Sequence, residues 1–293
     1  MKVSPHGYRT GRLPSRPEAI ARRIQLARFF DHAKLPALHD AFGPPASYRI
    51  PMYLNDQEGD CGPAACGHAV GENSLMSSGT ERIFADSEID AFYRGVTGGP
   101  DSGVDNEAMF NYWRQHGIGG DQPLVAYAAL QQGNTDQLDA AMEFFEGAVI
   151  LGLSLPDRVV PMDGTDWTTI PWTGTSGSPD PNNGHDVSCV SRQHGGGPYT
   201  VASWAAQIPM DAPFYGKYCD QPSVVLTAEV LDAASQKTGA GYSLQDLLED
   251  VAEITGQPSP YTPPPAPTPA PGCPLAVLML PASITTHLLG RMF

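Results

Sequence analysis

The stretch from Asn55 to Gly62 constrains this chain more than any other. It places an amide side chain, Asn55, six residues before Cys61, with a Gly-Asp pair directly before the cysteine and a run of small residues after it. Proline is tolerated in the first turn of a helix and alanine favours helix, so residues 62–70 are predicted to begin one. Unpaired N–H groups and the helix dipole at such an end lower a thiol pKa. We therefore expect an exposed, thiolate-forming nucleophile at Cys61.

The second part of the pattern is a histidine far downstream. His185 opens an apolar segment, and the triplet Ala202-Ser203-Trp204 begins seventeen residues after it. A histidine base takes the proton of a thiol and later delivers it to the leaving group. An amide donor near the sulfur stabilises the oxyanion, typically by roughly 3 kcal/mol. The order of these residues predicts thiol catalysis by Cys61 and His185, with Asn55 as the oxyanion donor.

In this order and spacing the residues resemble papain-like cysteine peptidases, in which a glutamine lies six residues before the nucleophile and Cys, His and Asn follow. The likeness is strongest to a divergent bacterial and phage group with Asn-Asp, Gly-Asp-Cys and Ala-Ala-x-x-His around the cysteine. The matching residues are Asn55-Asp56, Gly59-Asp60-Cys61 and Ala64-Ala65-Cys66-Gly67-His68. The resemblance covers about residues 50–228. It implies an α+β, papain-like two-lobed fold, with a helical half carrying the cysteine packed on an antiparallel sheet half carrying the histidine.

Two positions depart from the pattern of that family. Asn55 is shorter than the family's glutamine and must approach the sulfur by an adjustment of the backbone. The family's Asn-Ser-Trp reads Ala202-Ser203-Trp204 here, so the residue that would orient His185 has no polar side chain. Trp204 remains able to flank the imidazole. The orienting hydrogen bond is left to one of three polar side chains: Ser203, Asn182 or Asn183.

The charge of the chain limits the classes of partner. The 293 residues carry a net charge of −15, which argues against a nucleic-acid binder and against attraction to an anionic membrane surface. The charge is also uneven, since residues 1–50 contain nine Lys/Arg and three Asp/Glu, whereas the rest has a balance of −21. A basic N-terminal arm is thus joined to an acidic body.

Cysteine usage and apolar runs indicate the compartment. Five widely scattered cysteines fit a reduced compartment better than a disulfide framework. The N-terminus lacks the apolar core of a signal peptide, and no run approaches a membrane span. We therefore expect cytoplasmic synthesis and no membrane span. No cofactor is expected, because Cys61, Cys66 and His68 lack a convincing fourth ligand for zinc.

The chain divides into three parts. Residues 1–50 form the basic arm, with a probable helix near 17–30; residues 51–256 form the papain-like domain; and residues 257–293 form a proline-rich linker with an apolar C-terminal anchor. The arm either lies on its own body, covers the cleft as a pro-segment or tethers a partner. The apolar tail docks either on its own domain or, as we slightly prefer, on another subunit or a larger assembly.

Within the body, helices precede strands. Helices are predicted from Ser87, with a capping pattern, to near Gly95, over 106–116 with Gly117 as the stop, and over 135–146. Strands are predicted at 122–129, 148–153, 185–192, 199–204 and 223–227, with residues 156–184 as a long loop. This order is the one expected for a papain-like fold.

Two hypotheses for function follow from these observations. The first is a papain-like cysteine hydrolase, either a peptidase acting through Cys61 and His185 with a peptide substrate or an amidase acting on cell-wall peptides. The second is a structural or attachment protein of a phage particle, with a weakly active or inactive papain-like body and both termini bound to assembly partners. The missing amide at Ala202, the basic arm and the apolar tail favour this virion-associated alternative.

Overall fold

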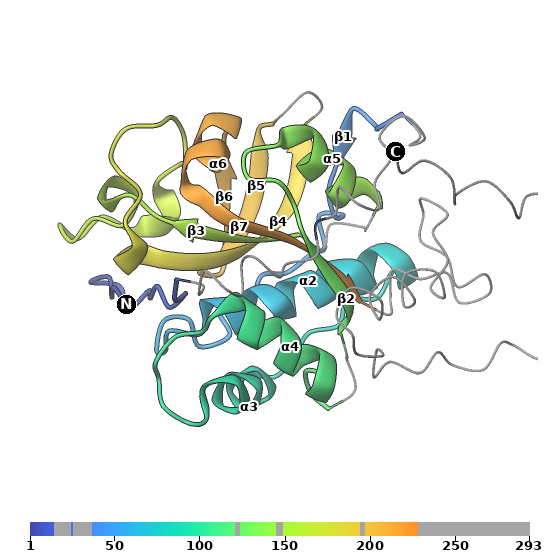
Figure 1. The fold of residues 1–293 in the computed structure, drawn as a ribbon, viewed down its shortest axis with the longest axis horizontal. Coiled ribbons are helices and arrows are strands. Elements are labelled where there is room, and N and C mark those ends of the chain that lie inside the picture. Colours follow the sequence, from blue (N-terminus) through green and yellow to red (C-terminus); the bar gives the residue numbers. More distant parts are fainter. Residues whose placement is uncertain (15–24, 26–36, 121–123, 145–148, 194–196, 228–293) are drawn as a thin grey trace, which may run out of the picture. The chain divides into compact units, whose positions relative to one another are not determined.

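A helix that begins at the predicted nucleophile lies against an antiparallel sheet in the computed structural model (Figure 1). The structure describes residues 1–14, 25, 37–120, 124–144, 149–193 and 197–227. Nearly all of the predicted arm helix near 17–30 and the whole segment 257–293 lie outside the described residues, so the linker and the anchor stay predictions.

The first four described helices of the body have the predicted order, and the fifth was not predicted. They are α2 (Cys61–Ser78), α3 (Asp86–Thr97), α4 (Asn106–His116), α5 (Thr135–Phe144) and α6 (Ala212–Tyr218). Helix α2 is buried from its first residue to Leu75 and ends at Gly79, whose φ of 73° belongs to the left-handed region. No described helix has both the length and the apolarity that a membrane crossing requires.

The boundaries of α3 differ from the prediction. The helix is capped at Ala85 rather than Ser87, because the Glu88 carboxylate accepts the N–H of Ala85 at 2.7 Å. It also continues past Gly95 to Thr97 and ends at Gly98, whose φ of 74° belongs to the left-handed region; Gly95 instead packs against Tyr112 of α4. In α4 the prediction is confirmed: Asp105 caps the start, and the Gly117 N–H bonds the Trp113 carbonyl.

One sheet of antiparallel pairs joins the strands in the order β2-β7-β3-β4-β5-β6, with β1 paired to β4. The strands are β1 (Ala41–Phe42), β2 (Leu124–Ala129), β3 (Val149–Ser154), β4 (Gly184–Gln193), β5 (Tyr199–Ser203), β6 (Ala206–Met210) and β7 (Cys219–Thr227). Strands β1 and β6 were not predicted. The short β1 adds residues of the predicted arm to the sheet of the body.

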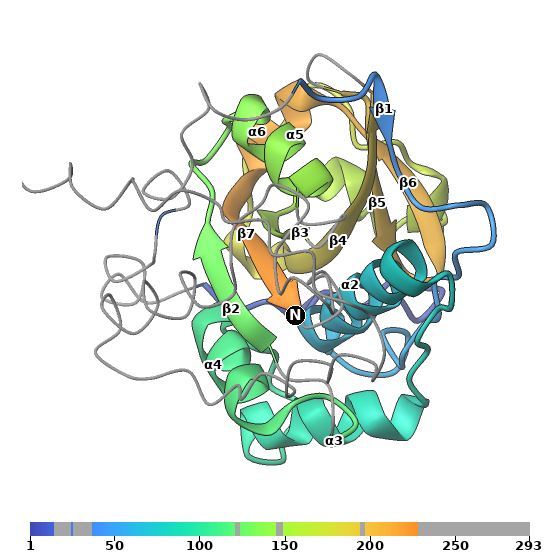
Figure 2. The same cartoon turned by 90° about the vertical axis from the view of Figure 1, so that its right-hand side faces the viewer.

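The two faces of the sheet belong to two hydrophobic cores. Alternation along β3 sends Ile150 into a core with α2, α3 and α4, and Leu151 into a second core on the opposite face. Figures 1 and 2 show these three helices on one side and most of the sheet with α6 on the other. The predicted α+β, two-lobed architecture is therefore confirmed.

The predicted loop 156–184 is more ordered than its composition suggests. It contains three short 3-10 helices (Asp157–Val159, Trp167–Thr169 and Pro181–Asn183). It also buries Trp167 and Trp172 completely in the sheet-side core. These two tryptophans are the sequence signal for a packed loop, because large aromatic side chains contribute most to a core when buried. The loop supplies part of the wall around the predicted base, His185.

Candidate active site

Cys61 lies at the first residue of α2, as predicted, but its sulfur is not exposed. The residue is 1% exposed, and Sγ accepts the backbone N–H of Asp186 at 3.4 Å. Burial raises the pKa of the thiol above its ordinary value; the charge of Asp186, more than that of Asp60, raises it further, and backbone hydrogen bonding by Asp186 and Gly11 opposes this. The prediction of an exposed thiolate is therefore wrong for this conformation, in which the thiol is protonated.

His185 follows Gly184 at the start of β4 and is completely buried. Its Nε2 lies 2.7 Å from the Ser203 hydroxyl, and its ring stacks on Trp204 with centroids 4.2 Å apart and an interplanar angle of 18°. Burial, helped by the positive charge of Arg12, lowers the pKa of His185 to about 3, so the imidazole is neutral. Its Nδ1 has no hydrogen-bond partner within the described part of the chain.

The hairpin between β5 and β6 holds Trp204 over the imidazole. Ser203 pairs with Ala206, so the loop has two residues, Trp204 and Ala205, with φ of 48° and 58°. Two positive φ values are typical of the type I′ turn, whose twist matches that of paired strands. The predicted flanking position of Trp204 is thus observed, and its indole N–H donates to the Arg9 carbonyl at 3.0 Å.

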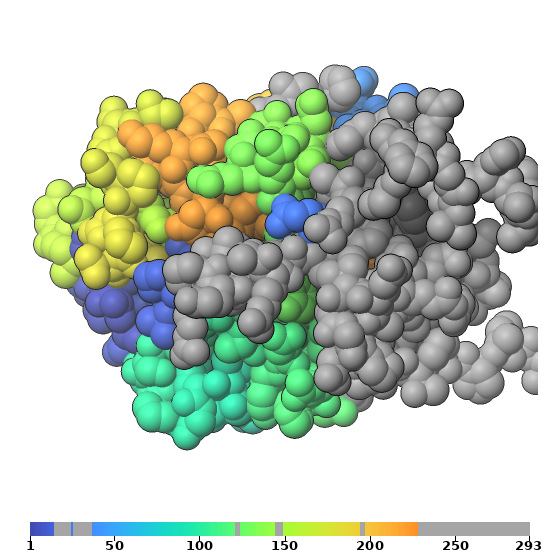
Figure 3. Space-filling model, in the orientation of Figure 1, coloured from blue at the N-terminus to red at the C-terminus, as the bar shows by residue number. Residues whose placement is uncertain are grey.

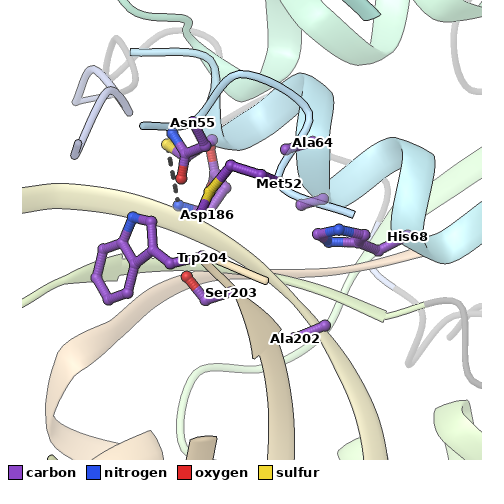
Figure 4. A pocket seen from close by; sticks show the side chains of 10 residues that line it. Met52, Asn55, Ala64, His68, Asp186, Ala202, Ser203 and Trp204 are labelled. Carbon is purple, nitrogen blue, oxygen red and sulfur yellow. Dashed lines mark hydrogen bonds between the residues drawn. The ribbon is translucent and has the colours of Figure 1, made fainter. Parts of the chain in front are cut away.

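Ser203, not position 202, bonds the imidazole. Alternation along β5 turns Ala202 toward α2, where it packs with Val190 and Leu75, away from His185. Figure 4 shows Ala202 on the His68 side of the cavity and Ser203 beside Trp204. The other two candidates bond elsewhere, Asn182 to Asp180 and Asn183 to Leu155 and Asp157. His185 therefore has a hydrogen-bonding partner, Ser203, although the family's asparagine is replaced by Ala202.

Removing the Ser203 hydroxyl should impair any reaction that uses His185 as a base. We expect Ser203→Ala to lower kcat about tenfold with little change in KM, as for groups that orient a reacting residue from behind. Ser203→Thr, which keeps a hydroxyl, should retain most of the rate. Both variants are made in a protein whose N-terminal segment is displaced from the sulfur by Gly11→Val, and steady-state hydrolysis of a fluorogenic peptide measures them. Ser188→Ala, a buried serine elsewhere on the sheet, is the matched control, and an equal loss there would contradict an orienting role for Ser203.

Restoring the family amide at position 202 should not help. Ala202→Asn puts a polar group among Tyr48, Leu75 and Val190, so we expect the free energy of unfolding to fall by about 1–3 kcal/mol. No gain in activity should accompany it. Urea denaturation measures the loss, with Ala206→Asn at a partly buried position of β6 as the control. A rise in activity would show that residue 202 reaches the imidazole after all.

Asn55 lines the same cavity as Cys61, together with Ser203 and Trp204 (Figure 4). The two residues before it, Tyr53 and Leu54, have φ of 52° and 70°. Such values are uncommon outside glycine. In this conformation the Asn55 Nδ2 donates to the Glu58 carbonyl at 3.3 Å.

His68 has a structural role in α2. Its Nε2 lies 2.8 Å from the Pro51 carbonyl oxygen, and its ring packs against Tyr53. Burial lowers its pKa to about 4. Within the described ranges, no three side chains of the His, Cys, Asp or Glu type cluster closely enough to hold a metal ion.

Asp186 is a site residue that the sequence analysis did not identify as one. Its backbone N–H bonds the Cys61 sulfur, and its Oδ1 accepts the Asn106 amide at 2.9 Å. Burial raises the pKa of this carboxyl to about 7. Its sequence signal was an acid inside a predicted strand, because ionisable side chains are seldom buried without a specific partner.

The N-terminal segment passes over the Cys61 sulfur between the two lobes. The N–H groups of Gly11 and Arg12 both donate to the Gly184 carbonyl, at 3.1 and 2.9 Å, directly before the predicted base. On the helical side, Val104 donates to the Gly11 carbonyl at 2.9 Å and accepts from Leu13 at 2.7 Å. Figure 3 shows the first residues, in dark blue, at the junction of the lobes.

The same segment contacts further residues of the site and of the acidic surface. The Arg9 N–H donates to the Asn55 carbonyl at 3.0 Å. Lys2 and Arg9 form ion pairs with Asp157 and Asp101, at 2.8 and 3.4 Å. Arm residues 1–13 therefore lie on the chain's own body and cover its predicted nucleophile.

Comparison with known proteins identifies the fold. No protein-family model and no curated protein matches the sequence. Among solved structures, procathepsin B S9 from Trypanosoma congolense superposes with a TM-score of 0.52 at 11% identity, over 74% of this chain and 86% of that one.

Two further solved structures are similar to smaller degrees. One is digestive procathepsin L 3 from the larval midgut of Tenebrio molitor, with a TM-score of 0.48 at 14% identity, over 65% of this chain and 71% of that one. The other is the bromelain protease from Ananas comosus in complex with the E64 inhibitor, with a TM-score of 0.40 at 10% identity, over 67% of this chain and 95% of that one. At these identities the likeness concerns the fold. The chain has the papain-like fold.

Proposed function

We propose that this chain, which has the papain-like fold, is a cysteine hydrolase that cleaves peptide bonds through Cys61 and His185. The contact of the Asp186 N–H with the Cys61 sulfur at 3.4 Å carries the proposal. Asp186 is the residue after His185 in β4, so this contact supports a pairing of the histidine with the cysteine at the first residue of α2. Asn55, Ser203 and Trp204 border the same cavity.

The chemistry assigns one role to each residue. His185 takes the thiol proton at Nδ1, which has no other partner among the described residues, while Ser203 holds Nε2. The sulfur attacks the peptide carbonyl carbon, and the oxyanion is stabilised by the Asn55 amide. The C–N bond then breaks as His185 returns the proton to the amine, and water hydrolyses the thioester.

The conformation described here is a latent one in this proposal. The arm excludes water and substrate from the sulfur, and burial favours the uncharged forms of both Cys61 and His185. A base with a pKa near 3 is too weak to hold a thiol proton near neutral pH. Departure of residues 9–13 restores water to the cleft, which moves both pKa values back toward their ordinary range. Of the three roles open to the arm, we favour that of a pro-segment.

A structural or attachment protein with an inactive body is the alternative. The protonated, covered thiol favours it, as does the lack of a hydrogen bond from any described residue to the Nδ1 of His185. It predicts that the thiol stays inert when the arm is displaced. The assembly partners and virion association that this alternative requires involve the chain termini, and they remain proposals.

Trapping of the thioester tests the two proposals. The variant Gly11→Val should displace the arm, because a side chain at position 11 meets the Gly59 backbone. Incubating this protein with a peptide p-nitrophenyl ester and quenching in acid should give an acyl adduct on the peptide that contains Cys61, seen by mass spectrometry. No adduct on Cys61, with the fold intact by circular dichroism, would favour the inactive scaffold.

A further inference from the structure

A charged side chain of the arm is inserted into a buried pocket beside the proposed nucleophile. The Arg12 side chain is 2% exposed. Its Nε donates to the Leu153 carbonyl at 3.3 Å, and its Nη2 donates to the Ser154 hydroxyl at 3.1 Å and pairs with the Asp220 carboxylate at 2.9 Å. Hydrogen bonds of this kind, with both partners charged, are among the strongest in proteins.

The pocket is built for a long side chain with a cationic end. Gly152 forms part of its wall, and a Cβ there would lie 3.0 Å from the Cδ of Arg12, so glycine provides the space for the stem. Ser154 also donates to Asp220 at 2.7 Å, which fixes the carboxylate. Burial raises the pKa of Asp186, and the positive charge of Arg12 opposes this rise. Without Arg12, the Asp220 carboxylate would lose its cationic partner.

The backbone around the pocket is suited to an extended peptide. The Gly184 carbonyl and both backbone groups of Val104 bond residues 11–13 in the manner of strand pairing. These bonds use only main-chain atoms of the arm, so any extended chain in the cleft can make them. Gly11 lies against the sulfur, and the pocket therefore receives the side chain of the residue adjacent to the one at the sulfur.

We infer that this pocket is a substrate subsite for arginine, occupied here by Arg12 of the chain's own arm. The inference rests on the proposed hydrolase function and specifies its substrates as peptides with arginine next to the residue at the nucleophile. Carboxylate Asp220, hydroxyl Ser154 and carbonyl Leu153 supply the recognition, and the arm competes for the same groups.

Binding of two matched peptides tests the subsite without requiring catalysis. The probes are acetyl-Gly-Arg-Gly amide and the same peptide with citrulline, which is nearly isosteric with arginine but uncharged. Calorimetric titration of the Arg12→Ala full chain should show the arginine peptide binding about tenfold more tightly, or more, than the citrulline peptide, the size expected for a charge-assisted pair. The unaltered chain should bind the arginine peptide at least about tenfold more weakly than Arg12→Ala, since Arg12 competes.

Variants of the acids supply the controls. Asp220→Asn in the Arg12→Ala chain should abolish the preference for arginine, whereas Asp136→Asn, at an exposed position of α5, should preserve it. Equal binding of the two peptides, no binding of either, or a preference that survives Asp220→Asn would overturn the subsite. A preference without cleavage of any bond of acetyl-Gly-Arg-Gly amide, followed by mass spectrometry, would instead overturn the proposed hydrolase and leave the subsite standing.

A second measurement covers the case in which Arg12→Ala does not fold. Asp220→Asn alone, in the otherwise unaltered chain, removes the charge that holds the arm. We expect it to speed labelling of Cys61 by iodoacetamide several-fold relative to Asp136→Asn. Equal labelling rates would show that Asp220 does not hold the arginine, and the inference would fall.

Discussion

Replacing Cys61 by alanine should lower peptide hydrolysis by the arm-displaced protein about 10⁴-fold or more, the loss seen when the nucleophile of a catalytic pair is removed. The reason is that every bond-breaking step passes through the sulfur. His185→Gln should cost about as much, because a thiol without its base remains protonated near neutral pH. Both variants are made in the Gly11→Val background and compared by initial rates on one fluorogenic peptide.

Matched controls for both residues lie on α2. Cys66 is a second buried thiol of this helix, with its sulfur 3.8 Å from that of Met109, and His68 is a second buried imidazole, bonded to Pro51. Cys66→Ala and His68→Gln should change the rate by less than about tenfold, through packing alone. Loss of activity in these controls equal to that in the site variants would point to a folding defect instead of catalysis.

Non-additivity provides a sharper criterion. If Cys61 and His185 act as one unit, the double variant should hydrolyse peptide about as slowly as either single variant. The reason is that the first substitution already abolishes the catalytic contribution of the second residue. Losses that multiply would mean that the two residues contribute independently. In that case the proposed nucleophile and base would not be a pair.

The sequence predicted the parts of the site that local chemistry determines. Cys61 begins a helix because small residues and an early proline follow it, and Gly117 ends α4 with a positive φ of 71°. Trp204 flanks His185 because the two-residue hairpin turn places it there. Each of these features depends on residues close together in the chain, so a motif is enough to reveal it.

Register and edge strands escaped prediction for physical reasons. Whether residue 202 or 203 faces the imidazole depends on the pairing of β4 with β5, which shifts between Cys189 and Ser191. Strand β6 contains Pro209, which is tolerated because β6 ends the strand order. For α6 a signal was available and missed: Asp211 caps the helix, with a proline in its first turn.

The position of the arm could not be read from any motif. Four glycines distant in sequence (Gly11, Gly59, Gly103 and Gly184) meet where the arm crosses the cleft, and side chains at several of them would collide with backbone. Such a meeting is a property of the folded chain. It also explains why the exposed thiolate expected of Cys61 is absent, since the arm and not the local sequence sets the environment of the sulfur.

The close contact of Gly11 with Gly59 makes it possible to open the site by one substitution. A Cβ on Gly11 would lie 1.9 Å from the Gly59 carbonyl oxygen and 2.4 Å from its carbon, and backbone atoms there have no side-chain freedom with which to yield. Overpacking typically costs about 1–3 kcal/mol. Because about 1.4 kcal/mol changes an equilibrium constant tenfold, the upper end of this cost corresponds to a roughly 100-fold larger population of the conformation with the arm displaced.

We therefore expect iodoacetamide to label Cys61 about 100-fold faster in Gly11→Val than in the unaltered chain. Mapping of the modified peptides measures the rate at each cysteine. Gly216→Ala is the control, because its Cβ would meet nothing closer than 4.0 Å. Labelling of Cys66, Cys189 and Cys219, which are buried in the body, should stay slow, and this distinguishes departure of the arm from global unfolding. If all four thiols react together, the arm is part of the core; if none does, something other than the arm covers the nucleophile, and the pro-segment proposal fails.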